Sequence, residues 1–267
     1  MVDVVEDGQI AILLSLERLA PFIAIAGTEG DAIRLHNQCL RLSSALMPVI
    51  ALTEIALRNA ICERLRLKLG VPNWLTSPPA ASLVWRPSEK TNIASAVIHA
   101  QRAAYAKLTN ADKKALDVLA FPNGVPQALG HAKRSKQRQA KIQVGIGQAV
   151  AQLSMFFWKR LFSDDYETSL WKPILRALFP NKSVSRINIA HHLEVIYQAR
   201  NRIAHHEAII GDRLTKLMDS IEFVNLNFGS KAPSDSAILA QLTRPFRQLL
   251  EQEIEVTKKL VDSFSMT

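Results

Sequence analysis

The densest group of polar side chains in this 267-residue sequence is ARNRIAHHEAII, residues 199–210, which interrupts an otherwise apolar helical pattern. It holds two arginines, an asparagine, two adjacent histidines and a glutamate. A histidine titrates near neutral pH and can carry a proton, and an arginine fork neutralises charge on phosphoryl oxygens. An asparagine can orient either partner. These residue types together favour proton transfer at a phosphate group.

The charged residues of this stretch fall on two faces of the predicted helix. Arg200 lies on its apolar stripe, whereas Asn201 and His205 share the opposite face and Arg202 pairs with His206 at the same spacing. In a straight helix Arg200 and His205 would point about 140° apart. Either the helix bends here, or Arg200 is a buried organiser and the other face meets the substrate. The apolar stripe consists of Ile189, Leu193, Ile196 and Ile203.

An acidic residue interrupts a second apolar stripe, in LMPVIALTEIALRNAICERL. Glu54 falls among the core-facing positions there. A lone charge in a core is unfavourable by several kcal/mol. We therefore expect Glu54 and Arg200 to pair, with Arg58 and Asn59 on the flank of the same site. A salt bridge that only fixes helix register is the structural alternative, but the neighbouring His and Asn groups favour a functional site.

The chain is strongly basic, with a net charge of +9 and a pI near 9.7. Such a charge favours a polyanionic partner or an anionic membrane over an acidic protein surface. Residues 118–163 contain no acidic residue, and their basic side chains form a candidate phosphate-binding surface. The five residues assigned to this surface are Lys133, Arg134, Lys136, Arg138 and Lys141. A solvated helix face is the ordinary alternative for such a run.

Spacings of three and four residues between apolar positions predict an all-α fold. Residues 1–228 are expected to form the main helical domain, in which 72–126 would be an insertion, and 229–267 a C-terminal helix packing on the bundle or on a dimer partner. Pro48 and Pro245 should each kink or delimit a helix. The predicted helices span residues 8–24, 31–69, 88–107, 111–119, 135–161, 166–178, 185–217 and 235–263.

Three ordered blocks resemble the Abi-like (abortive infection) family of the HEPN ribonuclease superfamily. The first is HNQCLRLSSALMPVIALTEIALRNAICERL with LGVPNWL, the second LSMFFWKRLFSDDYETSLWKPILRALFP, and the third RNRIAHHEAII, which contains the HEPN signature Arg-x4-His. Together they span about residues 35–210. The sequence departs from the family pattern at His36, at Met155 with Phe156, and at Ala208, none of which removes a residue of the signature.

The resemblance implies a HEPN-type helical bundle with additional helices and a metal-independent endoribonuclease. In that reaction the ribose 2′-OH attacks the adjacent phosphorus and leaves a 2′,3′-cyclic phosphate. The expected catalytic residues are Arg200, Asn201, His205 and Glu54, and the expected supporting residues are Arg58, Asn59, Arg202 and His206. The alternative is a HEPN module that binds RNA or protein without cutting.

The expected partners are RNA and a second copy of the chain, because one site holds a single signature histidine unless His206 also serves. An antitoxin or a regulatory RNA is a further partner that the resemblance allows, in a bacterial defence or toxin system. No cofactor and no metal are expected, since adjacent helical histidines diverge and no His-Glu-x-x-His spacing occurs. The acidic N-terminus and the lack of a long uninterrupted apolar run predict a cytoplasmic protein without a membrane partner.

Overall fold

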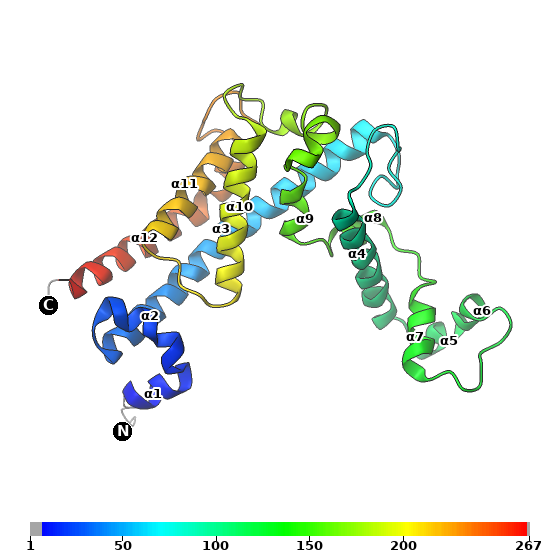
Figure 1. Cartoon of the computed structure of the whole chain (residues 1–267), viewed down its shortest axis with the longest axis horizontal. Coiled ribbons are helices and arrows are strands. Elements are labelled where there is room, and N and C mark those ends of the chain that lie inside the picture. Colours follow the sequence, from blue (N-terminus) through cyan, green and yellow to red (C-terminus); the bar gives the residue numbers. More distant parts are fainter. Residues whose placement is uncertain (1–6, 266–267) are drawn as a thin grey trace. The chain divides into compact units, whose positions relative to one another are not determined.

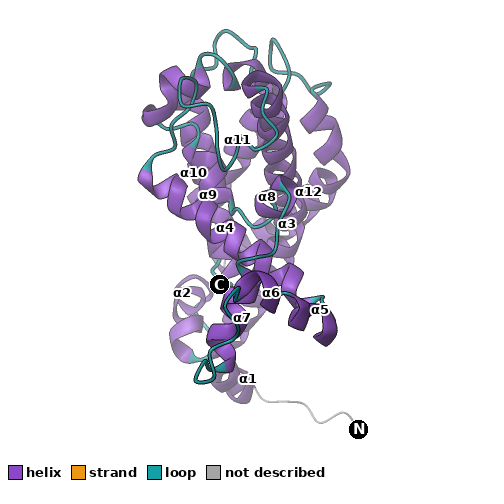
Figure 2. Ribbon diagram, turned by 90° about the vertical axis from the view of Figure 1, so that its right-hand side faces the viewer, coloured by secondary structure: helices purple, strands orange, loops and turns teal. Residues whose placement is uncertain are grey.

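The structure is a computed structural model that describes residues 7–265. It contains twelve α-helices, and no β-strand occurs among the described residues (Figures 1 and 2). The all-α class predicted from the sequence is confirmed. The chain divides into two compact units: unit 1 comprises the residues up to Ile61 and those from Leu175 onward, and unit 2 comprises Cys62–Ile174. The segment that separates from the bundle is thus longer than the insertion expected at 72–126.

Unit 1 contains the polar motif and is built from helices that pack pairwise. α10 packs on α11, α11 on α12, and α12 on α2, so the C-terminal helix joins this bundle (Figure 1). The boundary with unit 2 falls inside α3. The elements of unit 1 are α1 (Asp7–Leu14), α2 (Leu16–Ala26), α3 (Glu29–Leu69) as far as Ile61, a 3-10 turn η3 (Leu175–Leu178), α10 (Arg186–Ala204), α11 (Asp212–Asn227) and α12 (Ile238–Phe264).

The two apolar stripes predicted for α3 and α10 form much of the core of unit 1. α10 begins at a capping box, in which the Ser185 hydroxyl accepts from the Asn188 N–H and the Asn188 side chain accepts from the Ser185 N–H. The helices bury the stripes because their apolar residues recur every three or four positions. The buried members are Leu46, Ile50, Leu57 and Ile61 in α3 and Ile189, Leu193, Ile196 and Ile203 in α10.

Five predicted helices are each broken in the structure, and the prediction was wrong at those points. The 111–119 segment divides at Leu116, and the 166–178 segment forms 3-10 and π turns that are interrupted at 172–174. The 8–24 segment breaks at Ser15, whose backbone has a positive φ of 66° and whose hydroxyl caps α2. The 135–161 segment divides into three short helices separated at 140–145 and 151–154. The 185–217 segment ends after Ala204 and resumes beyond Gly211. Pro48 and Pro245 do not delimit their helices, because α3 and α12 continue through them.

Unit 2 consists of short helices around an aromatic core. Trp85, Phe157 and Trp158 are buried. The ring centroid of Phe157 lies 5.7 Å from that of Trp85 and 4.9 Å from that of Trp158. The elements of unit 2 are the remainder of α3, α4 (Pro87–Ala106), α5 (Asn110–Ala115), α6 (Asp117–Ala120), α7 (His131–Gln139), α8 (Ile146–Val150), α9 (Met155–Arg160), the 3-10 turn η1 (Asp164–Tyr166) and the π turn η2 (Glu167–Trp171).

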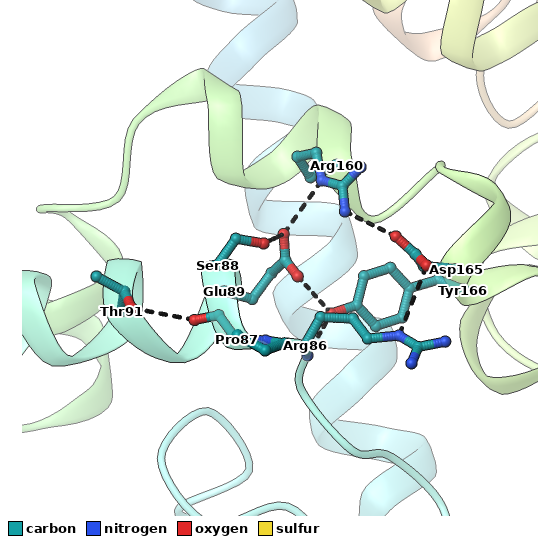
Figure 3. Close-up of polar contacts among 8 residues, drawn as sticks. All are labelled: Arg86, Pro87, Ser88, Glu89, Thr91, Arg160, Asp165 and Tyr166. Carbon is teal, nitrogen blue, oxygen red and sulfur yellow. Dashed lines mark hydrogen bonds and ion pairs between the residues drawn. The ribbon is translucent and has the colours of Figure 1, made fainter.

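One fully buried carboxylate, that of Glu89, lies in this core and is satisfied by hydrogen bonds (Figure 3). It accepts from the Tyr166 hydroxyl at 2.8 Å, from the Ser88 hydroxyl at 3.0 Å and from the Arg160 Nε at 3.2 Å. The Tyr166 oxygen in turn accepts from the backbone N–H of Arg86 at 3.1 Å. A buried charge that is paired and hydrogen-bonded in this way is tolerated, so the network ties α4 to the segments around Arg160 and Tyr166.

A stretch of α3 is apolar enough to span a membrane by length and composition, a test that the core helix of a soluble protein or a signal sequence passes equally.

Candidate functional site

The polar motif straddles the end of α10 instead of lying inside a continuous helix. α10 ends at Ala204, and His205 is its C-cap, with its N–H donating to the carbonyls of Asn201 and Arg202 at 3.1 Å each. Arg200 lies within α10 before its last turn, while His205 begins the turn that follows the helix.

The turn after α10 is closed by contacts between its own residues. His206 has a positive φ of 57°, a left-handed conformation that residues other than glycine seldom adopt. This reversal brings the Glu207 N–H to the Arg202 carbonyl at 2.8 Å. The Arg202 Nη1 then donates to the Glu207 carboxylate at 2.5 Å. Two of the predicted site residues, Arg202 and His206, thus shape the turn that carries His205.

A pocket of about 570 Å³ opens beside this turn. Its walls come from α2, from the turn and from the first turn of α11, all in unit 1. Basic groups predominate, because three arginines and two histidines face two glutamates. The residues that line it are Ser15, Glu17, Arg18, Pro21, Phe22, Arg202, His205, His206, Glu207, Ala208 and Arg213.

Helix α2 is held against the turn by polar and apolar contacts. The Arg18 Nη1 donates to the backbone carbonyl of His206 at 3.4 Å. Phe22 is buried in an apolar cluster against which Ala208 and Ile210 of the turn also pack. Arg18 and Arg213 were not predicted as site residues. No local pattern marks Arg18, whereas Gly211 was a signal that the helix could end and that Arg213 would begin a new one.

Behind the pocket wall lies the buried imidazole of His36. Its ring meets the Phe22 ring edge to face, with centroids 5.3 Å apart, and it is only 4% exposed. Burial lowers the pKa of His36 below its ordinary value, a hydrogen bond with Asn37 raises it, and the charges of Arg18 and His206 lower it further. Protonation of His36 is therefore disfavoured next to the basic pocket.

Glu54 and Arg200 lie outside the lining of this pocket and interact with each other electrostatically. Both side chains are half-buried. Burial raises the pKa of the Glu54 carboxyl, and the charges of Arg200 and Arg58 lower it in part. Among the described residues, however, no ion pair or hydrogen bond joins Glu54 to Arg200, so the expected contact pair is replaced by a longer-range attraction.

The remaining predicted residues around Glu54 differ in exposure. Arg58 is half-buried, and its Nε is a buried donor without a hydrogen-bond partner in the described part of the chain. Asn59 is exposed on α3, and Asn201 is half-buried on the last turn of α10. The structure thus separates the predicted site into a pocket group, with His205, His206 and Arg202, and an α3–α10 group.

The basic residues of the acid-free segment 118–163, here called the basic window, fall into two groups in unit 2. Arg134 and Arg138 both bind the carboxylate of Asp117, which immediately precedes the acid-free window, and Arg138 is buried. Hydrogen bonds from Arg138 and Arg134 hold the pKa of Asp117 well below its usual range. The expectation that Arg138 lies on an RNA-binding surface was wrong, since its side chain is buried and bound to Asp117. Lys133, Lys136 and Lys141 are exposed.

The pocket group has the side chains for acid–base chemistry on a phosphate. Its imidazoles can accept and donate protons, and its guanidinium groups can neutralise phosphoryl oxygens. Within residues 7–265 no three His, Cys, Asp or Glu side chains gather to hold a metal ion. No protein-family model, curated protein or solved structure matches this chain.

Proposed function

We propose that this protein is a metal-independent endoribonuclease of the Abi-like HEPN type, acting in a bacterial defence or toxin system in the cytoplasm. The observation that carries the proposal is the placement of His205 and His206 in one pocket with Arg18, Arg202 and Arg213. This combination of titratable and permanently cationic groups suits RNA, which supplies both a phosphodiester and its own nucleophile. The ordered resemblance of the three sequence blocks supports the same reaction.

In the proposed reaction, an imidazole accepts the proton of the ribose 2′-OH. The 2′ oxygen forms a bond to phosphorus, the bond from phosphorus to the 5′ oxygen breaks, and an imidazolium protonates the departing 5′ oxygen. The products are a 2′,3′-cyclic phosphate and a 5′-OH. His205 is the first proton carrier. The second is His206 of the same pocket or His205 of a second copy, and the latter makes a two-fold homodimer part of the proposal.

The α3–α10 group is assigned a positioning role. Arg200 precedes His205 by little more than one helical turn, and its charge, like that of Arg58, acts on the Glu54 carboxyl. We assign Arg200 and Glu54 to fixing the end of α10, Arg58 and Asn59 to the flank of that group, and Asn201 to orienting the histidine or a phosphate. Lys133, Lys136 and Lys141 extend the basic surface for RNA in unit 2.

An RNA cleavage assay in EDTA tests the proposal. Wild type, His205→Ala and the matched control His191→Ala, an exposed histidine on the same helix, are incubated with total RNA. Wild type and the control should cut, and His205→Ala should lose cleavage by a factor of about 100 or more with its fold intact. Persistent cleavage by His205→Ala would remove the catalytic assignment. RNA bound tightly but uncut by wild type would favour the non-catalytic binding module instead. If sedimentation shows a monomer at micromolar concentration, an active site shared between two copies of the chain is ruled out.

A further inference from the structure

The three arginines of the pocket are not electrostatically equivalent. Arg202 is compensated by Glu207, its partner across the turn. Among the described residues, neither Arg18 nor Arg213 forms an ion pair with a carboxylate. The two arginines come from different helices, α2 and α11, and neither belongs to the Arg-x4-His motif. The pocket therefore presents two uncompensated guanidinium groups beside the histidine turn.

Arg18 contacts the turn through one guanidinium nitrogen, and most of its donors stay available. One guanidinium nitrogen donates to the His206 carbonyl, and the packing of Phe22 holds α2 in place. A guanidinium carries five N–H donors in a rigid fork, so a single bond to a carbonyl leaves the others for a ligand. An anchored fork of this kind binds a phosphate with less loss of side-chain freedom than a mobile one.

The size of the pocket limits what these groups can bind. A volume of about 570 Å³ lies within the range of sites that enclose one small molecule, so one or two nucleotides enter and a duplex does not. Proteins that read single-stranded RNA track its backbone with basic side chains. A strand whose ribose reaches His205 must also place neighbouring phosphates inside the same pocket.

We propose that Arg18 and Arg213 form a phosphate subsite that binds the phosphates adjacent to the scissile one in single-stranded RNA. This inference rests on the proposed ribonuclease function, and it adds helix α2 and the start of α11 to the substrate-binding surface. It defines the substrate as a strand with at least two consecutive phosphates, because a single phosphate would engage only part of the basic pocket.

Binding of a fluorescent single-stranded 2′-deoxy oligonucleotide tests the subsite without any cleavage. Anisotropy titrations at several salt concentrations compare wild type, Arg18→Ala, Arg213→Ala and the control Arg244→Ala, which removes an exposed charge of α12. Each subsite variant should bind at least about 5-fold more weakly than wild type, and its slope of log K against log salt should fall by about 0.7, the value of one lost phosphate contact. The control should keep the wild-type slope.

The outcomes separate this inference from the proposed function. Wild-type affinity and slope in both Arg18→Ala and Arg213→Ala would overturn the subsite, even if His205→Ala still abolished cleavage of RNA. Weakened binding in both variants would support the subsite, even if wild type failed to cut RNA. Circular dichroism and thermal unfolding of each variant confirm that a loss of binding does not come from a loss of fold. The side chain of Arg18 is exposed, so its replacement should leave the fold intact.

Discussion

Arg18 donates a hydrogen bond to the backbone carbonyl of His206, although 188 positions separate the two residues in the chain. The contact joins the second helix to the turn that follows α10, and it places an arginine of the N-terminal region in the wall of the histidine pocket. The pocket is therefore assembled from two segments that are distant in the chain, α2 and the connection from α10 to the start of α11. The Arg-x4-His motif supplies one wall of the pocket and not the whole of it.

The left-handed backbone at His206 predicts that glycine is better tolerated there than alanine. His206→Gly and His206→Ala both remove the imidazole, but only alanine keeps a Cβ in the strained conformation at φ 57°. In urea unfolding, the glycine variant should be more stable than the alanine variant by about 1 kcal/mol. Both variants should show the same reduced RNA cleavage. Equal stabilities would contradict the assigned backbone strain.

The buried His36 predicts a loss of stability on acidification. Because burial lowers its pKa, the folded chain binds fewer protons at this site than the unfolded chain once the pH falls below about 6.5. The free energy of unfolding should therefore fall as the pH decreases through this region, until the lowered pKa is passed. His36→Phe keeps an aromatic edge against Phe22 and cannot be protonated, so it should flatten this dependence.

Urea unfolding of wild type and His36→Phe at about pH 7.5 and about pH 5.5 measures the effect. Part of the remaining slope should belong to His192, whose pKa is also lowered by burial, with the His191 charge as a further cause. His192→Phe is therefore the matched second variant. An unchanged pH dependence in His36→Phe would show that the imidazole does not resist protonation in the folded chain.

The parts of the fold that the sequence predicts are those governed by periodic burial. α3 and the apolar stripe of α10 follow from a repeat of three and four residues, which any long core helix requires. The end of α10 could not be located in this way, because Ile209 and Ile210 continue the apolar pattern through the turn. Gly211 was the one local sign of a break.

The site was less predictable than the fold, because it depends on contacts between distant segments. No spacing rule connects Arg18 to His206, and an isolated arginine in an N-terminal helix carries no signal of its own. The prediction that placed Arg138 on an RNA-binding surface failed for a related reason. Asp117, the acid that neutralises Arg138, stands one residue before the window begins, and the fold of α6 and α7 brings it back to that arginine.

The buried network of unit 2 predicts a large effect of removing one hydroxyl. Tyr166→Phe leaves the Glu89 carboxylate and the Arg86 N–H without one partner each, and should lower the free energy of unfolding by about 1–3 kcal/mol. Urea unfolding of Tyr166→Phe, Glu89→Gln and the double variant forms a mutant cycle. The two substitutions should be clearly non-additive, because their side chains share a hydrogen bond. Additive effects would contradict the network.

Neighbouring basic residues of α7 should behave in opposite ways. Arg138→Ala removes a buried partner of Asp117 and should lower the melting temperature, without a specific effect on RNA affinity. Lys136→Ala removes an exposed charge and should leave the melting temperature unchanged, while weakening RNA binding and its salt dependence. Thermal unfolding and anisotropy titration measure the two effects. A reversal of this order would contradict the division of the basic window.

The chemical ends of the RNA fragments show which oxygen attacked the phosphorus. RNA cut by the purified full chain in EDTA is analysed by mass spectrometry of short products. We expect 2′,3′-cyclic phosphates paired with 5′-OH ends, and the loss of both in His205→Ala. Fragments that carry 3′-OH and 5′-phosphate ends would contradict the proposed reaction, because attack by the ribose 2′-OH cannot produce them.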